Sequence, residues 1–185
     1  MPAPPPPGLS ADARLRHELV ALLRGRQAHV DARTVLADVP PEHLNRRPDG
    51  ADHSLWELAW HLWFTQRDIV DFCRDPGYTA PPWPDAYWPT SPGDASGWQA
   101  TVRAFHADAD ALAELARTAD LHAELAWAPG YTVLREVLLA ADHAAYHLGQ
   151  IVALRRRLGL WPSADGARAP STGWGDDAAA HTPGA

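Results

Sequence analysis

Segments rich in proline and glycine divide the chain into four stretches whose apolar residues recur at helical spacing. These stretches cover residues 11–39, 54–74, 94–118 and 132–160. Helices of roughly 20 to 28 residues are about 30 to 40 Å long, which suits a bundle around one shared core. We find no internal repeat and no strand-like alternation. The sequence therefore predicts an all-α protein, a four-helix bundle over residues 10–161.

The ends of the predicted helices carry local signals. The second begins with the capping box Ser54-Leu-Trp-Glu57, in which both side chains bond exposed backbone N–H groups. The fourth begins at Thr132 and ends near Gly159. The first ends before two consecutive prolines, although Gly25 weakens its second half. We nevertheless predict one helix over residues 11–39.

Three segments lie outside the helices. Residues 1–9 are dominated by proline, and residues 162–185 are rich in proline, glycine and alanine, so we expect a disordered arm and a disordered tail. Residues 75–93, between the second and third helices, hold six prolines and four aromatic residues. This connection is longer than a bundle usually needs. We therefore expect it to form a lid or pocket wall, with Tyr78, Trp83, Tyr87 and Trp88 as its aromatic residues.

The composition argues against several classes of function. Sixteen basic and 23 acidic residues give a net charge of −7, which does not favour a nucleic-acid partner. The sequence contains no lysine, which excludes Schiff-base chemistry, and Cys73 is its single cysteine, which excludes an internal disulfide. Residues 1–9 do not resemble a signal peptide, and charges interrupt the apolar stretches. We expect a cytoplasmic protein that acts on a small molecule, without nucleic acid or membrane.

Three of the ten histidines form a candidate metal site. His143 and His147 are one helical turn apart, beside the apolar arc of the fourth helix, so their ring nitrogens can converge on one ion. A helical wheel of the second helix places His61 at the same kind of position. Three imidazoles on two helices would leave coordination positions open for water or substrate, which is typical of catalytic zinc sites. We predict a metal site at His61, His143 and His147.

The same residues also fit roles that involve no metal. A histidine pair on a helix shoulder is more often solvated or hydrogen-bonded than bound to an ion. Glu57 and Gln150, each one turn from a predicted ligand, are candidates for supporting hydrogen bonds, but Glu57 also belongs to the capping box. The remaining histidines have no evident partner. Cys73 is expected to be an inert buried thiol.

Two segments resemble the DinB-like superfamily. They are Ser54-Leu-Trp-Glu-Leu-Ala-Trp-His61-Leu and the stretch from Leu134 to Ile151, with DH-x-x-YHLGQI as its most specific part. The resemblance covers about residues 11–160 and implies a four-helix bundle that binds a divalent metal through His61, His143 and His147. Similar proteins include mycothiol- and bacillithiol-dependent transferases, and dimers are expected in this family. A related iron-binding pattern has glutamate two residues after the last histidine, where this chain has Gly149.

The resemblance and the residues together favour one function over two others. The favoured function is a zinc- or nickel-dependent transferase. Its metal would bind a low-molecular-weight thiol such as mycothiol as the thiolate, which attacks a small electrophile. A metal-dependent hydrolase would use the same ligands. A non-catalytic homodimeric module would instead use its tryptophan-rich surface, including Trp56, Trp60 and Trp63, to bind a ligand or partner.

Overall fold

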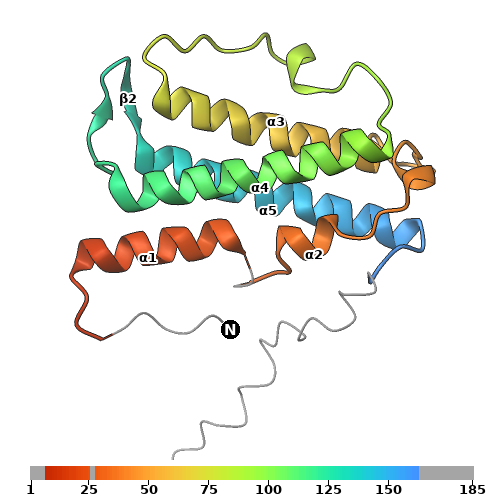
Figure 1. Ribbon diagram of the computed structural model, residues 1–185, viewed down its shortest axis with the longest axis horizontal. Coiled ribbons are helices and arrows are strands. Elements are labelled where there is room, and N and C mark those ends of the chain that lie inside the picture. The colour runs from red at the N-terminus through yellow and green to blue at the C-terminus, as the bar shows by residue number, and fades with distance from the viewer. Residues whose placement is uncertain (1–6, 26–27, 163–185) are drawn as a thin grey trace, which may run out of the picture.

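The computed structural model describes residues 7–25 and 28–162, and within them the chain is an all-α bundle (Figure 1). The four long helices are α1 (Ala11–Arg24), α3 (Leu55–Arg74), α4 (Ala95–Thr118) and α5 (Val133–Arg157), joined by the short helix α2 (Ala32–Leu36), two 3-10 turns (Pro41–His43 and Asp85–Tyr87) and the strands β1 (Glu124–Leu125) and β2 (Ala128–Thr132). The predicted fold class is confirmed. Most of the predicted arm and tail lies outside the described residues.

The predicted helix over residues 11–39 is wrong, because the structure divides it into α1 and α2. Gly25 ends α1 with a positive φ of 71°, and a Cβ there would lie 3.2 Å from the Cα of Asp31. Glycine permits both the left-handed backbone and this close approach. Asp31 then begins α2 by accepting a hydrogen bond from the backbone N–H of Thr34. Together α1 and α2 occupy one side of the bundle (Figure 1).

The absence of strands is the second prediction that the structure corrects. An antiparallel hairpin of β1 and β2 connects α4 to α5. With only two and five residues, and mostly exposed side chains, these strands are too short to show an alternating pattern. The indole N–H of Trp127 donates to the carbonyl of Phe72 at 2.9 Å, which holds the hairpin against the end of α3.

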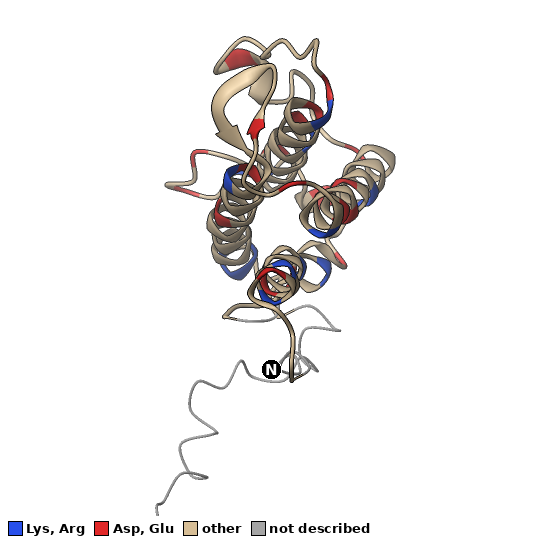
Figure 2. Cartoon of the chain, turned by 90° about the vertical axis from the view of Figure 1, so that its left-hand side faces the viewer, with Lys and Arg blue, Asp and Glu red and all other residues tan. Residues whose placement is uncertain are grey.

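The bundle core positions α3 against α5. Leu58 and Leu62 of α3 share one buried cluster with Leu148 and Ile151 of α5. The capping box at the start of α3 is confirmed, with Ser54 accepting from the backbone N–H of Glu57 and Glu57 accepting from that of Ser54. Figure 2 looks along the helices and shows charged residues of both signs distributed over them.

The C-terminal turn of α5 contains a buried cation. Arg155 is fully buried and donates to the carbonyl of Val35 at 2.6 Å and to that of Leu160 at 3.2 Å. These bonds tie α5 to α2 and to the segment that follows α5. Because burial disfavours the charged form, it lowers the pKa of Arg155 from its usual value.

Among the described residues, α5 is the one helix long and apolar enough to meet the criterion for a membrane span by length and composition. Core helices of bundles also meet this criterion. Ten of its residues are buried inside the protein, including Glu136, His147 and Arg155.

Candidate metal centre

The structure brings the three predicted histidines together. His61 comes from the first half of α3, and His143 and His147 come from the middle of α5. Their candidate ligand atoms all lie within 4.8 Å of one another. The Nε2 atoms of His61 and His143, from different helices, are 3.2 Å apart. His61 and His147 are buried and His143 is half-buried.

Core packing places the histidines where they meet. Leu62 follows His61 and Leu148 follows His147, and both leucines are buried in the same cluster. With these leucines fixed in the core, each preceding imidazole lies beside the α3–α5 contact. Because α5 brings His143 to the same side one turn earlier, all three rings share one region.

Hydrogen bonds orient two of the three imidazoles. The Nδ1–H of His61 donates to the backbone carbonyl of Tyr87 at 2.9 Å. Nδ1 of His147 lies 2.7 Å from Oε1 of Gln150, which accepts its proton. Both rings thereby carry their proton on Nδ1 and have the lone pair of Nε2 available for a metal, as metal-bound histidines commonly do, and Nε2 of His61 accepts a hydrogen bond from Nε2 of His143. Gln150, predicted from the sequence as a candidate for a supporting hydrogen bond, thus contacts His147.

Burial keeps the imidazoles neutral. It lowers the pKa of His61 and of His147, and together with the charges of His147 and His61 it lowers the pKa of His143 to about 3. A neutral imidazole has a lone pair to donate, whereas an imidazolium has none. All three rings are therefore in the ligating protonation state near neutral pH.

The donor set fits a divalent transition metal. Two nitrogens that bind one tetrahedral zinc ion at about 2.0–2.1 Å lie about 3.3 Å apart, close to the separation of the His61 and His143 nitrogens. Imidazole suits zinc, nickel, copper and iron rather than magnesium or calcium. The described cluster could thus hold such an ion with three protein ligands, which leaves coordination positions for other molecules.

Of the two roles considered for Glu57, the structure shows the one in the capping box. Both of its carboxylate oxygens bond to Arg47, and one also accepts from the backbone N–H of Ser54. Burial raises the pKa of Glu57, but these hydrogen bonds outweigh it and lower the pKa overall. Glu57 therefore stabilises the start of α3 through these bonds, whereas Gln150 contacts the triad.

Two tyrosines hold the predicted lid against α3. In Figure 1 the connection 75–93 runs back along α3 from its end toward its beginning. The hydroxyls of Tyr78 and Tyr87 donate to the two carboxylate oxygens of Asp68, at 2.6 and 2.7 Å. Burial and the Asp68 carboxylate raise the pKa of Tyr87 to about 12, so its phenol stays a donor. The connection is thus a wall fixed to α3, and the carbonyl that His61 contacts belongs to it.

The tryptophans of this wall differ in role. Trp88 stacks on the ring of His61 at 4.3 Å and on that of His53 at 3.9 Å between centroids. Trp83 is 72% exposed, with its ring edge near Tyr87. Of the four aromatic residues predicted there, Tyr87 and Trp88 therefore touch the site, while Tyr78 acts through Asp68.

Sequence reasoning missed Asp68, His53 and the Tyr87 carbonyl. Asp68 is seven residues after His61, a spacing that returns to the same helix face and could have indicated a supporting residue. A backbone carbonyl carries no residue-specific signal. His53 precedes the helix, and its contact with Trp88 joins positions 35 residues apart.

Comparison with known protein families identifies the family of this chain. A search of characterised proteins and a search of solved structures found no match. The family described as the DinB superfamily matches residues 18–151, which is more than two thirds of the chain. The matched segment includes all of α3 and α4 and the three clustered histidines. This chain therefore belongs to the DinB superfamily.

Proposed function

We propose that the protein is a divalent-metal-dependent transferase that joins a low-molecular-weight thiol to a small electrophile. The observation that supports this most is the convergence of three neutral imidazoles from two helices. In His61 and His147 the Nδ1 atom bonds a neighbouring residue, so the Nε2 lone pair is available for a metal. Zinc or nickel suits these ligands.

The chain offers neither a lysine nor a reactive cysteine as a nucleophile. The sequence has no lysine, and burial raises the pKa of Cys73, its one thiol, to about 12. A nucleophile supplied from outside and activated at the histidines is therefore the simplest chemistry for this site. A bound divalent ion would supply that activation by lowering the pKa of a thiol so that the thiolate forms near neutral pH.

The described residues would then act by positioning. His61, His143 and His147 bind the ion, and Tyr87 and Gln150 keep two of the rings in the ligating tautomer. The wall 75–93 shields the His61 side of the site from water through Trp88. In the overall reaction the thiol sulfur forms a bond to carbon, the leaving group departs with the bonding electrons, and the thiol proton is released to solvent.

Turnover with a thiol and a model electrophile tests this proposal. Untagged protein, loaded with zinc or nickel or stripped by a chelator, is mixed with mycothiol and monochlorobimane, and the fluorescent thioether is followed. We expect turnover that requires both metal and thiol and is lost in His61→Ala, His143→Ala and His147→Ala. His122→Ala, an exposed position, is the matched control.

Two results would contradict the proposal. The first is metal-loaded protein that shows no thiol-dependent turnover with any of a panel of electrophiles. The second is metal-dependent cleavage of esters or amides without any thiol, which would assign the site to hydrolysis instead.

A further inference from the structure

A small cavity lies between the segment before α3 and the last turns of α5. Its volume is about 190 Å³. The lining residues are Ala51, Asp52, His53, Leu58, Gln150, Ala153, Leu154 and Arg157. Pockets that enclose a whole drug-sized ligand measure about 300–1,000 Å³, so this cavity suits an end group of a molecule rather than all of it.

Two residues connect this cavity to the histidine cluster. Gln150 lines it and at the same time accepts the hydrogen bond from Nδ1 of His147. His53 also lines it and stacks on Trp88, which in turn stacks on His61. A molecule whose reactive end reaches the cluster can therefore place a second group here, because the α5 residues that line the cavity begin about one helical turn after His147 and extend to Arg157, almost three turns after it.

Arg157 gives the cavity a cation with free hydrogen-bonding capacity. Its one hydrogen bond among the described residues is a long one, 3.4 Å from Nη1 to the carbonyl of Asp49, and it forms no ion pair there. Two other arginines of this end of the bundle are already engaged, since Arg155 bonds carbonyls inside the core and Arg47 bonds Glu57, and Arg156 does not line the cavity. A guanidinium presents paired donors that match a carboxylate.

The remaining walls narrow the class of ligand. Four apolar side chains, those of Ala51, Leu58, Ala153 and Leu154, suit a short hydrocarbon segment, and the amide nitrogen of Gln150 is a further donor. The carboxylate of Asp52 at the same cavity opposes a multiply charged anion. The cavity chemistry thus favours one carboxylate on a short apolar chain over a phosphate.

We infer that this cavity is a subsite for a carboxylate group of the thiol or of its acceptor, with Arg157 as the residue that binds it. This inference rests on the proposed function for the reactive end of the molecule. It selects one arginine from the sixteen in the chain by its position and its unengaged donors.

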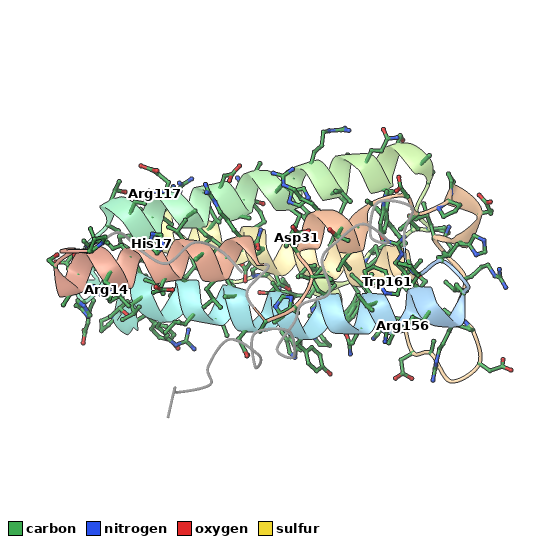
Figure 3. The ribbon with its side chains drawn as sticks, turned by 90° about the horizontal axis from the view of Figure 1, so that it is seen from below. Arg14, His17, Asp31, Arg117, Arg156 and Trp161 are labelled. Carbon is green, nitrogen blue, oxygen red and sulfur yellow. The ribbon has the colours of Figure 1, made fainter. Side chains whose placement is uncertain are left out.

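Binding of simple thiols to cobalt-loaded protein tests the subsite. The probes are ω-mercaptocarboxylates of two to six carbons and the matching uncharged amides, and the thiolate-to-cobalt absorption band measures binding without any turnover. We expect one chain length at which the acid binds roughly tenfold more tightly than its amide. Arg157→Gln should remove that preference, and Arg156→Gln, a change at the adjacent exposed arginine (Figure 3), should keep it.

The outcomes separate this inference from the proposed function. The subsite would be overturned if acids and amides bind the cobalt-loaded protein equally well at every chain length. It would also be overturned if Arg156→Gln lowers the preference for the acid as much as Arg157→Gln does. Neither result would affect the evidence for thiol binding. A missing thiolate band with all probes would overturn the proposed function. In that case saturation-transfer NMR of metal-free protein tests the subsite by comparing the binding of butanoate with that of butanamide. Tighter binding of butanoate that Arg157→Gln abolishes would support the subsite. Any other result would overturn it.

Discussion

Replacing Tyr87 with phenylalanine tests whether the wall 75–93 orients the metal centre. The hydroxyl of Tyr87 donates to Asp68 at 2.7 Å, and its backbone carbonyl accepts from Nδ1 of His61 at 2.9 Å. The substitution removes the first contact and keeps the ring that packs against Phe64. If the hydroxyl fixes the position of the carbonyl, its removal should weaken metal binding although it touches no ligand.

The expected size follows from the lost hydrogen bond. Hydrogen bonds to charged groups contribute about 1.5–3 kcal/mol. Asp68 is half-buried and keeps the bond from Tyr78, so water can replace the lost donor and the cost lies near the lower end. If that free energy is what holds the carbonyl on His61, the metal dissociation constant should rise by about tenfold.

Tyr78→Phe is the matched control, because Tyr78 donates to the same carboxylate but its carbonyl does not contact His61. Urea unfolding of the metal-free proteins should give a similar loss of stability for both variants. Competition with a chromophoric zinc chelator should show the tenfold loss of affinity only for Tyr87→Phe. Equal zinc affinities in the two variants would refute the reasoning that connects Asp68 to His61.

Three further predictions concern stability and reactivity. Gly93→Ala should lower the free energy of unfolding by about 1–3 kcal/mol, because the new Cβ would lie 2.3 Å from the indole of Trp56. Gly149→Ala, in the interior of α5 with open space around it, should instead raise the free energy of unfolding by about 0.5–1 kcal/mol. If urea unfolding shows that the two substitutions change this free energy in the same direction, the prediction is wrong. Native Cys73 should react with iodoacetamide near pH 8 at least about a thousandfold more slowly than in the unfolded chain, and equal rates by mass spectrometry would show that its pKa is not raised. In metal-free protein the stability that His143 contributes should be fully present above about pH 6.5. It should fall by up to about 1.4 kcal/mol per pH unit as the pH falls toward about 3, because the unfolded chain protonates His143 while the folded chain, with its lowered pKa, does not. His143→Gln should show a shallower loss in urea titrations, and an unchanged slope would count against this assignment.

The helices that hold the site were predictable because local signals define them. The expected stretch 54–74 corresponds to Leu55–Arg74, since the capping box and Pro76 mark its two ends. The expected stretch 132–160 corresponds to Val133–Arg157. Helical wheels of these two helices were enough to select the three histidines that meet, because each imidazole lies beside a strongly apolar face.

The remaining features depend on contacts between distant parts of the chain. Gly25 ends α1 where its backbone approaches Asp31, and the carbonyl that contacts His61 belongs to Tyr87, whose hydroxyl bonds Asp68. Arg155 belongs to a run of three arginines in the last turn of α5, but it alone of the three is buried, where it bonds the carbonyls of Val35 and Leu160. Such contacts have no local pattern in the sequence, so only the folded structure identifies them.

Metal analysis of untagged protein, with X-ray absorption of the zinc-loaded form, tests the central claim most directly. We predict one ion per chain, coordinated by three imidazole nitrogens at about 2.0–2.1 Å. Alanine at His61, His143 or His147 should each remove the ion while circular dichroism shows a folded bundle. Zinc that stays bound with unchanged affinity in any of these variants, or wild-type protein that binds no divalent ion, would contradict it.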